Sequence, residues 1–130
     1  MRRVFTALAT LLVLVVVSQF FLAASGAFNT APKDESFHPH RALGYGIVLI
    51  ALLVTAAAAL ARMPGRIIGM SALIAVLGAV QPLIRAVSDA VGDMGEPSMA
   101  NLVFGLHAVN GLVILGLAGG VAWLARTPDR

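Results

Sequence analysis

The sequence contains no cysteine and has few charged or aromatic residues. Of its 130 residues, 12% are charged and 6% are aromatic, whereas 59% are hydrophobic. The absence of cysteine excludes disulfide bonds, thiolate metal sites, covalently attached c-type haem and cysteine nucleophiles. The low charge combined with the high hydrophobic content excludes both an ordinary soluble domain and a disordered chain.

The hydrophobic residues are concentrated in long apolar runs. A bilayer core about 30 Å thick is crossed by roughly 20 helical residues. We therefore predict an all-α integral membrane four-helix bundle, a single domain over residues 1–130, with spans at about 4–24, 40–61, 67–88 and 98–125. A signal peptide competes for the first run, because the small residues 25–27 resemble a cleavage site. The length of the run and Gln19 near its far end favour a span, and the sequence does not decide whether it is cleaved.

Basic and acidic residues gather at opposite ends of the predicted spans. With four crossings, one side receives Arg2, Arg3, Arg62, Arg66, Arg126 and Arg130, and the other receives Asp34, Glu35, Asp89, Asp93 and Glu96. Arginine-rich ends face the cytoplasm in most membrane proteins. We therefore expect a multi-pass cell-membrane protein with both termini cytoplasmic. The net charge of +3 then reflects topology in the lipid bilayer, and no nucleic-acid partner is expected.

One motif, Phe-x-x-His-x-x-x-Gly, occurs twice. It comprises Phe37, His40 and Gly44 in the first copy and Phe104, His107 and Gly111 in the second. A histidine and a glycine four positions later share one helix face, so each copy presents an imidazole beside a gap that a flat, bulky group could enter.

The helix that precedes each motif carries a matching glutamine. Gln19 and Gln81 are each the only amide in their predicted span, and both lie in its outer part. The chain therefore resembles two helical hairpins related by a pseudo-two-fold axis along the membrane normal. Such an axis would bring His40 and His107 together in the outer half of the bundle.

Each candidate residue also has a purely structural interpretation. His107 can be a neutral imidazole bonded to Gln81 or to a carbonyl instead of a metal or haem ligand. Arg41 can pair with Asp34 or Glu35, and Arg85 with Asp89, instead of meeting haem propionates. Gly44 and Gly111 can serve close packing, and Asn110 can bond across helices. No paired carboxylates, nucleophile with a base, or phosphate loop occurs in the sequence, so whether the protein is an enzyme stays open.

His40 with Arg41 at the start of the second span, and His107 with Asn110 in the fourth, resemble one four-helix half of haem A synthase. The resemblance implies haem-ligating histidines on the second and fourth helices. Phe37 stands where that family has a glutamate, the outer-loop cysteine pair is absent, and half of the helices are present, which counts against oxidation of a haem methyl group. The chain also resembles a group of uncharacterised small four-helix bacterial membrane proteins, which implies no activity.

These observations favour a b-type haem protein in an electron-transfer or haem-handling role. His40 and His107 would be the axial ligands of haem b, Arg41 and Arg85 would meet its propionates, and Gly44 and Gly111 would make room for the ring. Electrons would come from a quinol or a membrane partner subunit. The alternative is a non-enzymatic accessory or assembly subunit of a larger membrane complex without a cofactor. A weaker alternative is a copper or zinc site formed by His38, His40 and His107.

Overall fold

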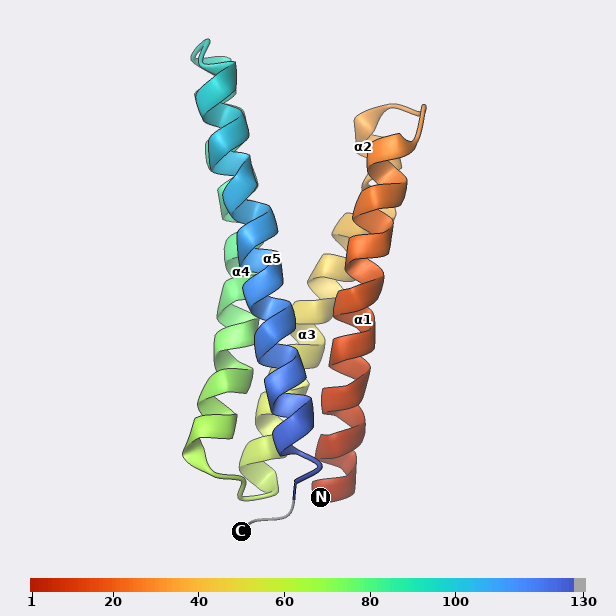
Figure 1. Ribbon diagram of the computed structural model, residues 1–130, viewed down its shortest axis with the longest axis vertical. Coiled ribbons are helices and arrows are strands. Elements are labelled where there is room, and N and C mark those ends of the chain that lie inside the picture. Colours follow the sequence, from red (N-terminus) through yellow and green to blue (C-terminus); the bar gives the residue numbers. More distant parts are fainter. Residues whose placement is uncertain (128–130) are drawn as a thin grey trace.

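The computed structural model describes residues 1–127 and shows an all-α protein. Its helices are α1 (Arg2–Phe28), α2 (Lys33–Ser36), α3 (His38–Leu60), α4 (Gly65–Asp93) and α5 (Pro97–Leu124) (Figure 1). Four of them, α1, α3, α4 and α5, are long and apolar enough to cross a membrane. The prediction of an all-α bundle with four long apolar helices is confirmed, and these helices correspond to the four spans predicted from the sequence.

The segment between the first two predicted spans, 4–24 and 40–61, is largely helical. Helix α1 continues to Phe28, and the short helix α2 follows it. A β-carbon on Gly26 would lie 2.9 Å from the carbonyl oxygen of Ser36, so the last turn of α1 packs directly on the turn into α3. Burial of this contact stabilises helical turns that hydrophobic periodicity alone does not reveal. Pro39 occupies the first turn of α3, where its missing N–H costs no hydrogen bond.

Helix α4 contains Pro82 in its interior and remains one continuous helix. A proline at this position removes the helical hydrogen bond to the carbonyl of Gly78. The side-chain amide of Asn110 on α5 donates to the adjacent carbonyl of Leu77, at 2.9 Å. The interhelical interpretation of Asn110 is therefore confirmed, and this bond joins α5 to α4 next to the proline.

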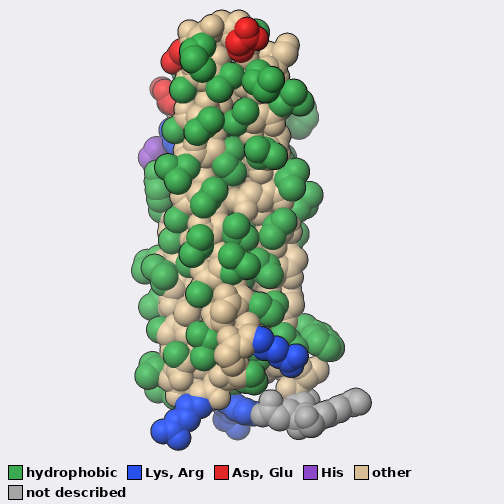
Figure 2. All heavy atoms as spheres, turned by 90° about the vertical axis from the view of Figure 1, so that its left-hand side faces the viewer, with side chains coloured by type: hydrophobic (Ala, Val, Ile, Leu, Met, Phe, Trp, Pro, Cys, Tyr) green, Lys and Arg blue, Asp and Glu red, His purple; other side chains and the backbone are tan. Residues whose placement is uncertain are grey.

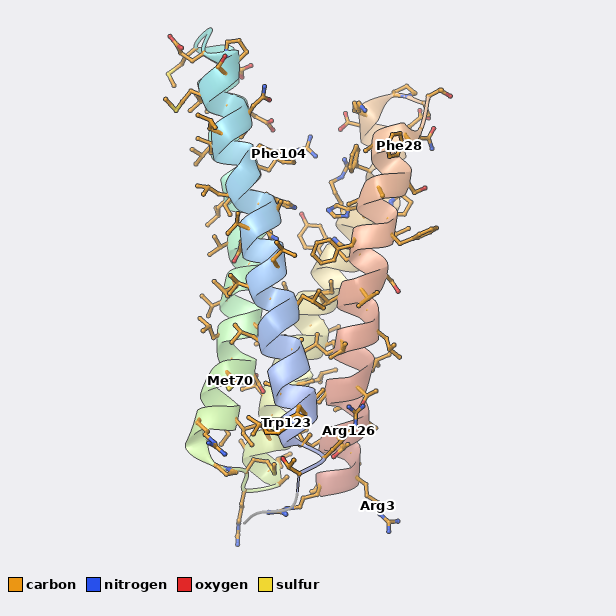
Figure 3. The ribbon with its side chains drawn as sticks, viewed as in Figure 1. Arg3, Phe28, Met70, Phe104, Trp123 and Arg126 are labelled. Carbon is orange, nitrogen blue, oxygen red and sulfur yellow. The ribbon has the colours of Figure 1, made fainter. Side chains whose placement is uncertain are left out.

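The arginine-rich end of the bundle, called the basic end here, holds most of the core. Arg2 and Arg3 begin α1, Arg62 and Arg66 flank the α3–α4 turn, and Arg126 follows α5. Figure 3 places Arg3, Arg126 and the exposed Trp123 there, while Phe28 marks the opposite end. Arg130 lies outside the described residues. The largest fully buried apolar side chains belong to this half and come from all four long helices: Phe5, Leu12, Val54, Ile74 and Val121.

The opposite, acidic end carries the carboxylates of the α1–α3 connection and the α4–α5 turn. Figure 2 shows acidic side chains at this end, basic side chains at the other, and hydrophobic side chains over the length between them. The helix pairs α1 with α3 and α4 with α5 diverge towards the acidic end (Figure 1). The core thus closes one half of the bundle and leaves the two hairpins apart in the other half.

Candidate functional site

A cavity of about 1190 Å³ lies between the two hairpins in the acidic half. It exceeds the usual volume of a small-molecule site, roughly 300–1,000 Å³. The buried side chains of Val16, Ile47 and Ile114 close it where the core begins. All of the residues that the sequence singles out for cofactor binding line this one cavity: His40, Arg41, Gly44, Arg85, His107 and Gly111.

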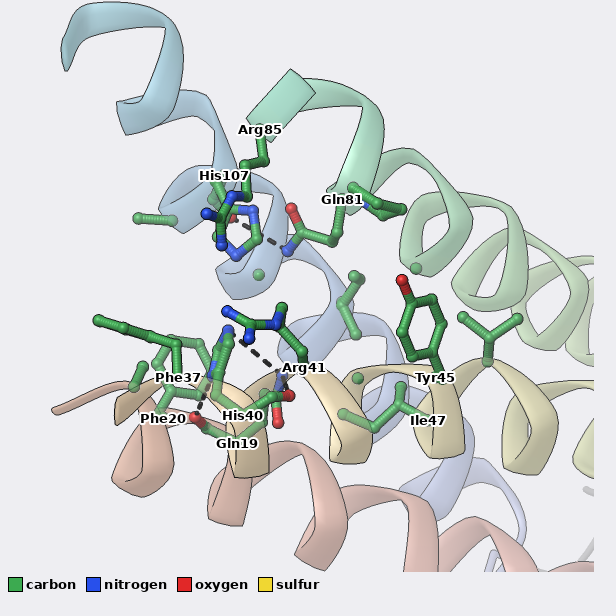
Figure 4. A pocket seen from close by; sticks show the side chains of 18 of the residues that line it. Gln19, Phe20, Phe37, His40, Arg41, Tyr45, Ile47, Gln81, Arg85 and His107 are labelled. Atoms are coloured by element: carbon green, nitrogen blue, oxygen red, sulfur yellow. Dashed lines mark hydrogen bonds between the residues drawn. The ribbon is translucent and has the colours of Figure 1, made fainter. Parts of the chain in front are cut away.

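The two imidazoles face each other across the cavity (Figure 4). The ring centroids of His40 and His107 are 6.1 Å apart, and the ring planes are inclined by 44°. Each ring also contacts the phenylalanine of its own motif: Phe37 is edge-on to His40 at 6.0 Å, and Phe104 stacks on His107 at 5.2 Å. The three-residue spacing places each phenylalanine one helical turn before its histidine, on the same face. The phenylalanines therefore hold the imidazoles against the cavity wall.

The backbone of α1 fixes the orientation of the His40 ring. Nδ1 of His40 lies 3.2 Å from the carbonyl oxygen of Gln19, a pure acceptor, so Nδ1 carries the proton in this contact. Nε2 then carries the lone pair, and the amide nitrogen of Gln19 lies 3.4 Å from it. Donation from one ring nitrogen to a carbonyl is the usual way in which proteins orient a metal-binding imidazole. The Nε2 electron pair of His40 thus faces the Gln19 amide, and a metal ion could bind this nitrogen only in place of that contact.

The two glutamines make the same contact in both hairpins. The amide of Gln19 donates to the carbonyl of His40 at 2.8 Å, and the amide of Gln81 donates to the carbonyl of His107 at 3.1 Å. A β-carbon on Gly44 would lie 3.2 Å from the Gln19 amide nitrogen, and one on Gly111 would lie 3.6 Å from that of Gln81. Each glycine of the motif therefore leaves space for an amide from the neighbouring helix. This is the close-packing interpretation of the glycines, and contact with a flat guest stays a prediction.

Replacing either Gln19 or Gln81 by leucine is expected to lower the free energy of unfolding by roughly 0.6–1.7 kcal/mol, the range measured for interhelical hydrogen bonds in membranes. Unfolding of each variant in mixed detergent micelles with increasing dodecyl sulfate measures the effect. Ser18→Ala is the control, because its hydroxyl donates to Leu14 within α1 and touches no other helix in its hydrogen bonding. Equal unfolding midpoints for the glutamine variants and the wild type would contradict the assignment.

Three buried polar atoms on the residues that line this cavity have no hydrogen-bond partner within the described chain. They are Oε1 of Gln19, Oε1 of Gln81 and Nδ1 of His107. A buried polar atom without a partner typically costs about 1–3 kcal/mol. Water or a guest that supplies hydrogen bonds there would relieve this cost. These three polar atoms are consequently available to form hydrogen bonds with a molecule bound in the cavity.

The two arginines of the cavity are paired with acids of their own hairpins. Nη1 of Arg41 lies 3.6 Å from Oδ1 of Asp34, and Nε of Arg85 lies 3.4 Å from Oδ2 of Asp89. The structural interpretations of both residues are therefore realised. Such partly exposed ion pairs contribute only about 0–1 kcal/mol, so an anionic group at the acidic end of the cavity could share these guanidinium groups at little cost.

His38 does not line the cavity. Among residues 1–127, no three histidine, cysteine or acidic side chains approach closely enough to hold a metal ion, so the copper or zinc site of His38, His40 and His107 is not formed. Two aromatic cavity residues are missing from the sequence-based site. Phe20 lies 3.5 Å from the position of a Gly111 β-carbon, and Tyr45 stands on α3 directly after Gly44. In the sequence, Phe20 follows Gln19 and Tyr45 follows Gly44, and this proximity to candidate residues could have identified both as cavity residues.

A family model described as a family of unknown function (DUF6220) matches residues 19–87, just over half of the chain. The matched segment begins at Gln19, contains His40 and Gln81, and ends before His107. No curated protein and no solved structure matches the chain. The comparisons therefore assign no ligand or activity to the cavity.

Proposed function

The chain belongs to DUF6220, a family of unknown function, and from the geometry of its cavity we propose that it is a b-type haem-binding membrane protein. His40 and His107 are the axial ligands in this proposal. Its role is electron transfer or haem handling. When bound, haem supplies one-electron chemistry, and two axial histidines leave no open position for a substrate.

The separation of the imidazoles is the observation that carries the proposal. A metal–imidazole nitrogen bond is about 2 Å long, and the nitrogen lies about 1 Å from the ring centre. Two imidazoles on opposite sides of one iron would thus have their centroids roughly 6 Å apart. The centroids of His40 and His107 are 6.1 Å apart. The fixed tautomer of His40, with Nδ1 on the Gln19 carbonyl, agrees with ligation through Nε2.

The rest of the cavity suits the two ends of a haem. Its closed end, at Val16, Ile47 and Ile114, is apolar and suits the hydrocarbon edge of the ring. Arg41 and Arg85 lie towards the acidic end, where their guanidinium groups can bind the propionates. Gly44 and Gly111 leave space in the walls beside the histidines, where the amides of Gln19 and Gln81 pack.

The matched contacts support an internal repeat as the origin of this symmetric site. In each hairpin a glutamine donates to the carbonyl of the histidine, and a glycine four residues later leaves space for the amide. We place the basic end, with both termini, in the cytoplasm of the cell, because arginine-rich ends are retained there. The histidines then lie in the outer half of the cell membrane. A quinol or a membrane partner subunit is the expected electron donor.

The test is an absorption spectrum of the detergent-purified protein titrated with haem. We expect a Soret band that saturates at one haem per chain and the sharp visible bands of a six-coordinate ferrous haem after reduction. A colourless protein that binds no haem would overturn the proposal. Co-purification of that colourless protein with a larger complex would instead favour the accessory or assembly subunit, in which the histidines only join helices.

A further inference from the structure

Tyr45 has a hydroxyl group without a hydrogen-bond partner in the described structure, although it lies well inside a predicted span. Helix α3 has 23 residues, so at roughly 1.5 Å per residue it is only a few ångströms longer than a bilayer core. Tyr45 is about 10 Å from the start of this helix. Its backbone therefore lies below the boundary at which membrane tyrosines reach polar headgroups, and the residue is 68% exposed beside the cavity.

The cavity opens to the lipid at Tyr45. In Figure 4 the tyrosine ring stands on α3 and points towards α4. From there the cavity continues over Leu49 and Leu52, which are 59% and 53% exposed, so its wall merges with the lipid-facing surface of α3. On the opposite side, the Phe20 ring packs against Gly111 and joins α1 to α5. The α3–α4 side is consequently the route between the cavity and the bilayer.

We propose that this opening binds an isoprenoid quinone or quinol from the membrane. The ring of the quinone accepts a hydrogen bond from the Tyr45 hydroxyl, and its tail lies over Leu49 and Leu52. Binding at this place requires no haem, whereas a role as electron carrier rests on the proposed function. An isoprenoid quinone is thus a more specific electron donor than the quinol or partner subunit named in the proposed function.

Three features favour a quinone over a phospholipid or a fatty acid. The opening is formed by Tyr45, Leu49 and Leu52, which carry no charge, whereas the guanidinium groups of Arg41 and Arg85 lie towards the acidic end, where they pair with Asp34 and Asp89. The Tyr45 ring is itself a flat aromatic surface at the opening, which suits a planar guest. The free group at the opening is a hydroxyl that can donate to a quinone carbonyl.

The position also suits electron exchange with a group held by the histidines. Tyr45 follows His40 by five residues, about 7.5 Å along the helix axis, and both line the same cavity. A quinone at Tyr45 would lie at the edge of the space between the imidazoles without replacing either ring. Contact at an edge is sufficient for transfer of single electrons.

The experiment is photolabelling of haem-free protein in nanodiscs with an azidoquinone that carries a decyl tail, followed by peptide mapping. Labels are expected on α3 and α4 around Tyr45. Tyr45→Phe should weaken labelling about tenfold, the effect of one hydrogen bond of ~1.4 kcal/mol, and Leu52→Trp should block the tail. Leu53→Trp is the matched control, because Leu53 is 48% exposed on the same helix and does not line the cavity.

Three results would overturn the inference: labels distributed evenly over all helices, equal labelling of the Tyr45→Phe variant and the wild type, or equal loss in the Leu52→Trp and Leu53→Trp variants. A tailless azidoquinone should label weakly, and excess phospholipid should not compete. The haem titration tests the proposed function independently. Specific quinone labelling without a Soret band would contradict haem binding and leave the quinone site standing. A Soret band without specific labelling would sink only the quinone site.

Discussion

Replacing His107 by alanine is expected to lower haem affinity by about a hundredfold or more, because loss of a group that merely supports a metal ligand already costs about 10–100-fold. The same loss is expected for His40→Ala. In both variants the remaining histidine would leave the iron five-coordinate, and the visible bands of the reduced protein would broaden. Haem titrations followed at the Soret band measure the affinities.

His38→Ala is the matched control for these variants. His38 belongs to the same helix as His40, is exposed, and does not line the cavity, so its removal should leave the titration unchanged. Free imidazole should restore the six-coordinate spectrum of His107→Ala by occupying the space of the lost side chain. Unchanged haem binding in both cavity variants would mean that any bound haem has other ligands.

Gly78→Leu is expected to lower the free energy of unfolding by about 1–3 kcal/mol, the usual cost of overpacking. A β-carbon at Gly78 would lie 2.9 Å from a methyl carbon of Val48, closer than real β-carbons come. Valine is β-branched and cannot rotate away freely, so α3 must move away from α4. Because this contact lies beside the cavity, the separation of the imidazoles should change as well. Unfolding in detergent and haem affinity measure the two effects.

Gly69→Leu on the same helix supplies the comparison for this variant. No atom lies within 4 Å of a β-carbon at Gly69, so the added side chain would face open space. Leucine also favours a helix over glycine by up to about 1 kcal/mol, and the stability should stay level or rise. Equal destabilisation by both substitutions would show that the cost comes from the leucine itself and not from the contact between α3 and α4.

The sequence predicts the spans and the arrangement of the cavity residues because both follow from spacing. Apolar runs of membrane length become α1, α3, α4 and α5, and a repeated spacing placed His40 and His107 at a common level. The pairing of Gln19 and Gln81 with histidine carbonyls was not predictable in detail, since the sequence does not give the rotation of one helix against another. The same holds for helix α2, which depends on contacts with Gly26.

The functions of individual cavity residues depend on features that spacing does not encode. The glycines of the two motifs look alike whether they face a macrocycle or an amide, and only their neighbours show that an amide fills the space. Tyr45 carries no pattern of its own, and the quinone contact proposed for it rests on its position at the cavity lining. Arg41 and Arg85 satisfy the same sequence rule for ion pairs and for anion binding, so the sequence could not separate these functions.

Most of the buried side chains hold the hairpins together at the basic end, whereas the hairpins diverge at the other. The imidazoles therefore lie in the half of the bundle where the two helical hairpins lie apart. A small change in the angle between the hairpins would change the distance between the imidazoles. Lateral pressure and thickness of the surrounding leaflet act on this half directly. In a bundle that spans the bilayer, lipid composition would thus change the separation of the imidazoles and, with it, the affinity for a guest.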